Sequence, residues 1–459
     1  MPRKSQPEGS AGGEKLPRKS HTWASNGAQF PSTEGCVILP APGLCAALRK
    51  PLAETSGVSE QPLHCALFCA IVDNFGDIGV CWRLARQLTH EHGVRVTLWV
   101  DDIVAAERFM ASQGHAKLPA FCEGVDVRHW PSHPGDFAEV LRSDLLIEAF
   151  ACHLPRPLLD AMGRAERLPV WVNLEYLSAE PWVAEHHLLA SLLHLPGAAA
   201  ARPPARKTFF FPGFTPATGG LLRESGLLQR HDHWQRNVPE SRRQLLRRWH
   251  PRVAETLAPD ALLISLFSYE TAAMASWLQA LADDSVPTLL LVSQGRSLAG
   301  VAAFLEQPLE VGEVVCRGAL QVLVIPFMAQ DDYDELLSLC DFNCVRGEDS
   351  FVRAQWAARP LLWHIYPQQE QAHLQKLEAF LQLQQAQTGP CDALQAASAL
   401  ALGQFMRFWN QGEDCGELWH HLRPQLSGLR ERAGKWQQHL AEMPDLATSL
   451  LRFCRSQSR

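Results

Sequence analysis

Two separate series of buried strands and amphipathic helices alternate along this chain, and this alternation limits the possible folds more than any other feature. Strands that alternate with helical segments form a parallel sheet with helices on both faces. The expected strands are 65–72, 95–100, 125–130, 144–148 and 169–173 in the first series, and 261–267, 288–293, 321–325, 341–345 and 360–363 in the second. The sequence therefore predicts an α/β protein with two doubly wound, Rossmann-like domains.

An interruption rich in Ala, Pro and Gly at 195–220 separates the two series and predicts the connection between the domains. Residues 1–62 are rich in Pro, Gly, Ser and Lys and follow no period, which is typical of a disordered extension or of an overlong start. The expected division is an extension at 1–62, an N-terminal domain at 63–200, a C-terminal domain at 201–435 and a C-terminal helix at 436–459 that can pack back on the N-terminal domain.

Composition excludes several classes of protein. A chain of 459 residues exceeds what one hydrophobic core organises, so it agrees with two domains. A net charge of -7 without a basic stripe argues against a nucleic-acid partner. The 13 cysteines form no C-x-x-C pair, which disfavours disulfides or zinc and favours a reducing cytoplasm. No apolar run is long enough to span a membrane, and no signal peptide is recognisable.

A loop with two carboxylates follows the first expected strand. Asp73 and Asp77 are four residues apart, and we expect Gly76 and Gly79 to let the backbone turn sharply before a helix begins. Asp77 could act in catalysis or cap the helix, because an acidic residue near a helix start is favoured by the free N–H groups and the dipole. The residues alone support both interpretations equally.

A second polar segment, 345–353, follows a buried strand of the second series and opens a helix. Gly347 permits close backbone approach, the helix N-terminus offers N–H donors to an anion, and Arg346 adds charge for a diphosphate. Glu348 could bind hydroxyls of a sugar or a ribose. An ordinary capped helix with an ion-paired arginine is the equal alternative.

Aromatic and polar side chains also follow neighbouring strands of the second series. Phe267 and Phe327 could stack on a base, while Tyr269 and Gln330 could reach phosphates or base edges. Most aromatic residues at strand ends belong to the core, so these positions are weak evidence by themselves.

Other functional motifs are absent from the sequence. It contains no P-loop, no G-x-G-x-x-G after the first strand and no H-E-x-x-H, so it predicts neither a cofactor nor a metal. His153 and His364 each stand alone beside apolar residues and are expected to be structural.

Two long blocks, 72–88 and 341–356, resemble the arginine rhamnosyltransferases of elongation factor P. Shorter stretches at 147–152, 173–178, 211–214 and 363–367 support the resemblance, which extends from Cys65 to the C-terminal helices. It implies a GT-B fold, a dTDP-β-L-rhamnose donor held mainly by the C-terminal domain, and inverting transfer to one arginine of elongation factor P, which activates that factor.

The resemblance also implies roles for individual residues. Catalytic roles are expected for Asp73, Asp77 and Glu348. Contacts to dTDP-rhamnose are expected from Asn74, Phe75, Gly76, Phe267, Tyr269, Phe327, Gln330, Arg346, Gly347, Glu348, Asp349 and Ser350.

An arginine acceptor explains why two aspartates should lie together. The guanidinium group keeps its proton up to a pKa above about 12, and its lone pairs are delocalised. Paired carboxylates can orient one nitrogen and take its proton, and we expect Asp77 rather than Asp73 to be the base. The alternatives are another nucleotide-sugar enzyme, such as an epimerase or a lipid or saccharide glycosyltransferase, and a non-catalytic protein that binds a nucleotide or a translation factor.

Overall fold

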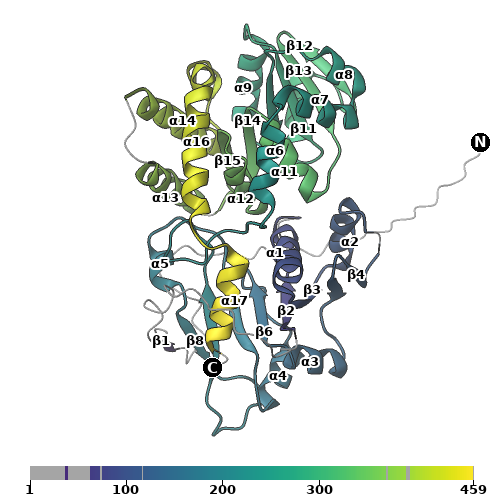
Figure 1. The fold of residues 1–459 in the computed structure, drawn as a ribbon, viewed down its shortest axis with the longest axis vertical. Coiled ribbons are helices and arrows are strands. Elements are labelled where there is room, and N and C mark those ends of the chain that lie inside the picture. The colour runs from purple at the N-terminus through teal and green to yellow at the C-terminus, as the bar shows by residue number, and fades with distance from the viewer. Residues whose placement is uncertain are drawn as a thin grey trace, which may run out of the picture.

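The computed structural model consists of two lobes, one built from each series of strands (Figure 1). It describes residues 62–72, 75–115, 117–368, 371–388 and 393–457, together with the strand at 37–39. Outside that strand, the extension expected at 1–62 lies almost entirely beyond the described residues. Among the described helices, none combines the length and the apolar character that a bilayer span requires.

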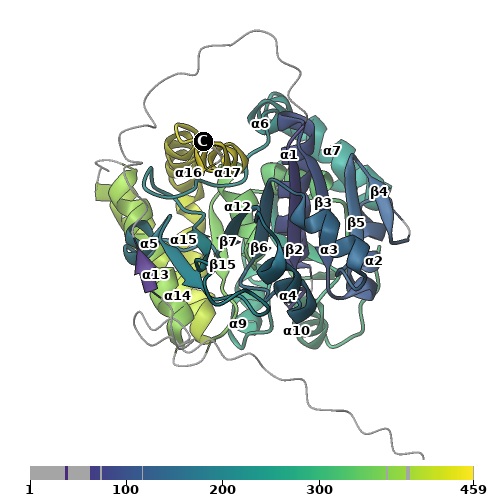
Figure 2. The ribbon, with the colours of Figure 1, turned by 90° about the horizontal axis from the view of Figure 1, so that it is seen from below.

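The N-terminal sheet has the strand order β1-β8-β9-β7-β6-β2-β3-β5-β4. Its strands are β1 (Val37–Leu39), β2 (His64–Cys69), β3 (Arg95–Val100), β4 (Ala120–Cys122), β5 (Val125–His129), β6 (Leu145–Ala149), β7 (Val170–Leu174), β8 (Ala190–Leu193) and β9 (Ala205–Phe210). The central strands are parallel, whereas β1, β4 and β8 pair antiparallel with their neighbours. Figure 2 shows β7, β6, β2 and β3 side by side.

The C-terminal sheet has the order β12-β13-β11-β10-β14-β15. Its strands are β10 (Leu262–Leu266), β11 (Thr288–Ser293), β12 (Val314–Arg317), β13 (Leu320–Ile325), β14 (Phe342–Arg346) and β15 (Leu361–His364). All neighbours are parallel except the edge strand β12, which is antiparallel to β13. Both doubly wound sheets predicted from the alternation are therefore present.

Helices cover the sheets and form the C-terminal part of the chain. They are α1 (Gly76–His92), α2 (Ile103–Ser112), α3 (Pro134–Leu141), α4 (Arg156–Arg164), α5 (Trp182–His186), α6 (Leu227–Gln235), α7 (Val238–Trp249), α8 (Pro251–Thr256), α9 (Ala273–Ala282), α10 (Ser297–Leu305), α11 (Gln330–Leu339), α12 (Asp349–Trp356), α13 (Ala372–Gln387), α14 (Ala393–Gln411), α15 (Gly416–Leu422), α16 (Leu426–Ala441) and α17 (Leu446–Gln457), with a short 3-10 helix η3 (Arg423–Gln425).

Each sheet has a point at which the chain order reverses direction across the sheet. In the N-terminal sheet this point is β2, which lies between β6 and β3, and in the C-terminal sheet it is β10, between β14 and β11. Ligands of such sheets bind beyond the carboxyl ends of the strands at these points. The segment from β2 to α1 and the segment from β14 to α12 both lie at such a point.

Tryptophans form much of the C-terminal core. Trp277 of α9 packs edge to face against Trp409 and Trp419, with ring centroids 5.3 and 5.8 Å apart. All three are fully buried. Edge-to-face pairs of large rings add to the stabilisation from buried area, so one tryptophan from each of α9, α14 and α15 helps to join these helices.

The last helix crosses back to the first lobe. Residues of α16 pack in the C-terminal core, whereas α17 packs in the N-terminal core, where the rings of Phe453 and Phe210 are 6.1 Å apart. In Figure 1 the yellow helices α16 and α17 accordingly lie in different lobes. Two boundaries differ from those expected at 200 and 436: β9 still belongs to the N-terminal sheet, and α16 continues through Ala441 before the chain crosses over.

Leu450→Ala should show how much this return crossing stabilises the fold. Leu450 is fully buried among the N-terminal core residues, so its truncation should cost about 2–5 kcal/mol. We expect a clear fall in the thermal unfolding midpoint, whereas Leu400→Ala, at a position that is 61% exposed, should change it little. Equal midpoints for the two variants would mean that α17 is not an integral part of the N-terminal core.

Candidate active site

Asp77 lies in the first turn of α1, directly after the switch point at β2. Its side chain is buried, and its two carboxylate oxygens accept hydrogen bonds from the Val72 backbone N–H at 2.9 Å and the Tyr176 hydroxyl at 3.2 Å. Asp73 and Asn74 lie outside the described residues. The structure thus places one of the two predicted aspartates at the carboxyl end of the N-terminal sheet.

The two glycines of this segment have a different role from the one expected. Gly76 and Gly79 both lie within α1 rather than in a sharp turn. A Cβ on Gly79 would lie 3.2 Å from Asp349 Oδ2 and 3.3 Å from the amide nitrogen of Gln330. Gly79 therefore lets α1 approach the C-terminal lobe closely.

Glu348 approaches Asp77 from the other lobe. It is the N-cap residue of α12, and its Oε2 accepts a hydrogen bond of 2.9 Å from the backbone N–H of Leu177. Because Tyr176 contacts Asp77, two consecutive residues after β7 link the two carboxylates. Tyr176 is not among the predicted site residues, although it lies in the stretch 173–178 that resembles the family.

The surroundings of these carboxylates are weakly solvated. Burial raises the pKa of Glu348 to about 8; the Leu177 hydrogen bond and Lys376 oppose this shift, and the charge of Asp77 adds to it. Burial, followed by the charge of Asp77, also raises the pKa of the Tyr176 hydroxyl well above its ordinary range. Glu348 is therefore mostly protonated at neutral pH, and Tyr176 keeps its proton and donates to Asp77.

Glu348→Gln is expected to flatten the pH dependence of stability. In the parent protein the pKa of this carboxyl rises from 4.5 to about 8 on folding, so the folded state holds the proton more tightly than the unfolded state. Its contribution to the free energy of unfolding is therefore full below about pH 4.5 and is lost as the pH rises from there through about 8. The loss can reach about 1.4 kcal/mol per pH unit within this window. Urea unfolding at several pH values should show the variant gaining stability relative to the parent as pH rises. A constant difference would contradict the raised pKa.

The β10 and β14 ends form the expected cationic and aromatic edge. The Arg346 guanidinium lies 4.6 Å from the ring centroid of Phe267 and 4.5 Å from that of Tyr269. Gly347 follows with a φ of 68°, a conformation that favours glycine, and the Ser350 hydroxyl donates to the carbonyl of Arg346. The predicted residues on these two adjacent strands therefore come together at one edge of the sheet.

Two further expected residues, Phe327 and Gln330, follow β13 and contact the other lobe. Phe327 packs against Phe75 with ring centroids 4.9 Å apart. The Gln330 amide donates to Asp349 Oδ2 at 3.0 Å, and Arg83 of α1 donates to Asp349 Oδ1 at 2.8 Å. The predicted donor-site residues thus lie where the two lobes meet.

Two other features lie outside this junction. Burial lowers the pKa of His364 to about 4, and its Nδ1 lies 2.8 Å from the Ser268 hydroxyl, as expected for a structural histidine.

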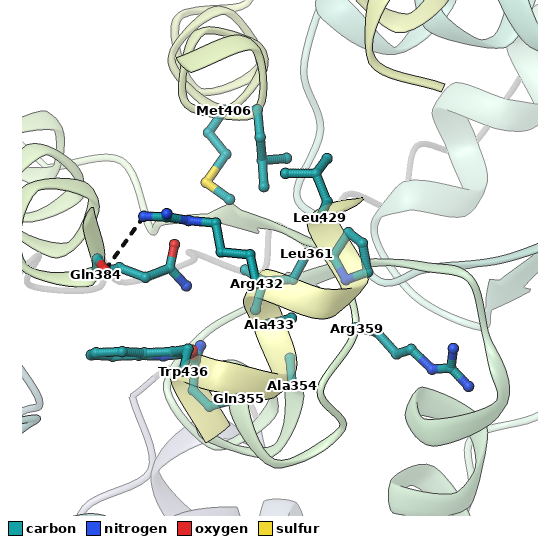
Figure 3. A pocket seen from close by; sticks show the side chains of 12 residues that line it. Ala354, Gln355, Arg359, Leu361, Gln384, Met406, Leu429, Arg432, Ala433 and Trp436 are labelled. Atoms are coloured by element: carbon teal, nitrogen blue, oxygen red, sulfur yellow. Dashed lines mark hydrogen bonds between the residues drawn. The ribbon is translucent and has the colours of Figure 1, made fainter. Parts of the chain in front are cut away.

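A pocket between α12, α13, α14 and α16 includes Arg432, which donates to the Gln384 backbone carbonyl at 3.4 Å (Figure 3). No predicted site residue lines this pocket. Among the described residues, no three His, Cys, Asp or Glu side chains converge as metal ligands.

Two facing doubly wound domains, with carboxylates and a cationic aromatic edge at their junction, define a glycosyltransferase with the GT-B fold. The model of the family described as "Elongation-Factor P (EF-P) rhamnosyltransferase EarP" matches residues 65–455. The chain belongs to this EarP family of EF-P rhamnosyltransferases, so its acceptor is elongation factor P.

Individual relatives agree with this assignment. The protein-arginine rhamnosyltransferase of Pseudomonas putida is 48% identical over 392 residues, covering 85% of this chain and 98% of the relative. That of Shewanella oneidensis is 37% identical over 409 residues, covering 86% and 98%. A solved structure described as the structural basis for EarP-mediated arginine glycosylation of EF-P is 37% identical, with a TM-score of 0.59, covering 86% of this chain and 99% of that one.

Proposed function

We propose that this rhamnosyltransferase uses dTDP-β-L-rhamnose, inverts the anomeric carbon and employs Asp77 and Glu348 on opposite sides of the junction. The observation that carries the proposal is the link through residues 176–177, which joins Asp77 of one lobe to Glu348 of the other. This link holds one acidic side chain from each lobe close to the same segment, residues 176–177.

The donor binds at the edge formed by β10, β13 and β14. Phe267 follows β10 and Phe327 follows β13, the strands on either side of β11, and their rings flank the thymine at this edge. The diphosphate lies at the N-terminus of α12, where free N–H groups, Arg346 and Ser350 stabilise the charge that develops as dTDP leaves. Tyr269, Gly347, Asp349 and Gln330 complete the donor site.

The acceptor guanidinium binds beside α1. Asn74, Phe75 and Gly76 contact the sugar-nucleotide donor. Asp77, together with Asp73, accepts its N–H groups and localises a lone pair on the attacking nitrogen. The nitrogen–C1 bond forms as the bond from C1 to the dTDP oxygen breaks, and the lost proton passes to Asp77. A single displacement of this kind needs no covalent enzyme intermediate and no metal.

The contacts already made by Asp77 are compatible with this role. Its Oδ2 accepts from the Val72 backbone N–H and its Oδ1 from the Tyr176 hydroxyl. These hydrogen bonds fix the orientation of the carboxylate. Glu348, largely protonated with a pKa of about 8, can both donate to and accept from the hydroxyls of rhamnose.

We also propose that the protein acts in the cytoplasm. Buried cysteines such as Cys65, Cys340 and Cys344 are free thiols, which fits a reducing compartment, and the family's acceptor is a translation factor.

The anomeric configuration of the product tests the proposed chemistry. Incubation with elongation factor P and dTDP-β-L-rhamnose, followed by NMR of the modified factor, should show an α-linked rhamnose on an arginine nitrogen. A β-linked product would overturn the single displacement, and labelling of a different side chain would overturn the role given to Asp77.

A further inference from the structure

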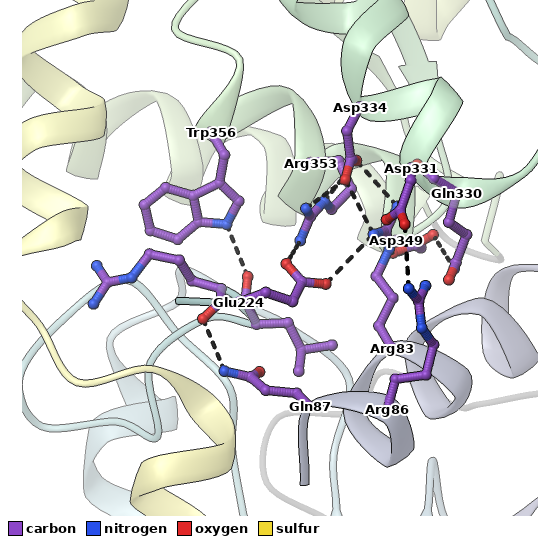
Figure 4. Close-up of polar contacts among 12 residues, drawn as sticks. Arg83, Arg86, Gln87, Glu224, Gln330, Asp331, Asp334, Asp349, Arg353 and Trp356 are labelled. Carbon is purple, nitrogen blue, oxygen red and sulfur yellow. Dashed lines mark hydrogen bonds and ion pairs between the residues drawn. The ribbon is translucent and has the colours of Figure 1, made fainter. Parts of the chain in front are cut away.

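A buried polar network joins α1 of the N-terminal lobe to α11 and α12 of the C-terminal lobe (Figure 4). Arg83 is its connection to α1, with a side chain that is fully buried. The guanidinium donates to Asp349 Oδ1 at 2.8 Å and to Asp334 Oδ1 at 3.1 Å. The helix that carries Asp77 in its first turn is thereby joined to the helix that begins after Glu348.

The network passes through two residues of the proposed donor site. Asp349 receives Arg83 on one oxygen and the Gln330 amide on the other, at 2.8 and 3.0 Å. The same Gln330 side-chain nitrogen donates to the backbone carbonyl of Gly79 at 3.0 Å, and the backbone carbonyl of Gln330 accepts from Arg83 at 3.3 Å. Arg83 and Gly79 of α1 therefore hold both side chains from the opposite lobe.

We propose that Arg83 is a positioning residue for the sugar-nucleotide donor, acting through Asp349 and Gln330. This inference rests on the donor site proposed above. The C-terminal domain carries the donor contacts, but α1 of the N-terminal domain sets the orientation of two of them. Donor affinity therefore depends on how α1 is seated against the C-terminal lobe.

The remaining contacts of Arg83 explain why an arginine is needed. Its Nη atoms contact Asp334 and lie 3.5 Å from Glu224, while Nε contacts Asp349. Arg353 contacts the same Asp334 and Glu224, at 2.6 and 2.7 Å, and so fixes these carboxylates from the other side. A lysine offers a single ammonium group and cannot keep the planar set of contacts to three carboxylates at once.

Calorimetric titration with dTDP-β-L-rhamnose, without acceptor, tests the proposal on the full chain. Arg83→Gln should weaken donor binding at least about tenfold and raise the donor KM similarly, and Arg83→Lys should recover part of the affinity. The matched control is Arg86→Gln, three residues along α1, whose exposed ion pair with Asp331 also crosses the junction but touches no donor residue. It should bind the donor within about twofold of the parent.

Gly79→Ala keeps the test valid if Arg83→Gln does not fold. Alanine favours a helix over glycine, but its Cβ would press on Asp349 and Gln330. We expect an unchanged or higher unfolding midpoint together with a severalfold weaker donor affinity.

Three outcomes separate the possibilities. If both variants fold and bind the donor as the parent does, the network is only structural and the inference is overturned. If Arg83→Gln does not fold, parent-like donor affinity in Gly79→Ala alone has the same consequence. A lower unfolding midpoint in Arg83→Gln with unchanged donor affinity would have the same meaning. If the parent itself binds no dTDP-rhamnose, the proposed donor fails first, and the inference fails with it.

Discussion

Asp77→Asn is expected to lower the rate of rhamnose transfer by roughly 10²–10⁴-fold, the range typical for loss of a general base. The amide has nearly the shape of the carboxylate, but it cannot take a proton from the guanidinium, and its NH₂ group repels the acceptor's own N–H donors. The amide oxygen can still accept from Val72 or Tyr176, so the fold should persist. The measurement is the initial rate of modification of elongation factor P.

A matched aspartate controls for the loss of a backbone contact. Asp101 follows the neighbouring strand β3 and accepts the Ile71 backbone N–H at 2.8 Å, much as Asp77 accepts that of Val72. Asp101→Asn should therefore leave the transfer rate nearly unchanged. If Asp77→Asn modified the factor at the parent rate while binding the donor normally, its function would be to anchor the start of α1 rather than to act as a base.

Asp334→Ala should cause the largest loss of stability, about 3–5 kcal/mol, because it removes a carboxylate that neutralises two buried arginines. Arg83 and Arg353 both donate to its carboxylate, at distances from 2.6 to 3.3 Å, and both side chains are almost completely buried. Glu224 cannot take over the role of Asp334, because it is already ionised and paired with the same two arginines. Burial acts to raise its pKa, but Arg353 and Arg83 lower it to about 2.

Urea unfolding followed by tryptophan fluorescence measures this loss. The control is Asp331→Ala, on the same helix α11, whose carboxylate is 56% exposed and pairs with Arg86 at 3.2 Å. An exposed pair contributes about 1 kcal/mol or less, so the control should unfold close to the parent. Similar unfolding midpoints for the two variants would contradict the importance assigned to the buried network.

Strands with a strong buried pattern could be predicted from the sequence, and short edge strands could not. Residues 289–292 are continuously apolar between Thr288 and Ser293, and β11 spans 288–293 as predicted. By contrast, the antiparallel strands β4, β8 and β12 are only three or four residues long, too short for a period to be recognised. The strand β9 falls within the stretch rich in Pro and Gly that we expected to connect the domains, which is why the boundary was placed too early.

Residues of the site that follow strands were predictable, and those that hold the lobes together were not. Parallel strands bring their carboxyl ends to one edge, so Phe267, Tyr269 and Arg346 could be grouped from the sequence. Arg83 contacts Asp349, which lies 266 positions further along the chain, and no spacing or motif indicates such a pair.

The family match also favours EF-P rhamnosylation over the alternative nucleotide-sugar enzymes and over a non-catalytic binding protein.

Intact-mass analysis of elongation factor P gives the most direct test of the central claim. The factor is incubated with the full chain and dTDP-β-L-rhamnose, and again with Asp77→Asn in place of the parent. We predict a mass increase of one deoxyhexose with the parent, located on an arginine by fragmentation, and almost none with the variant. An unmodified factor with the parent chain, or equal modification by both proteins, would contradict the account.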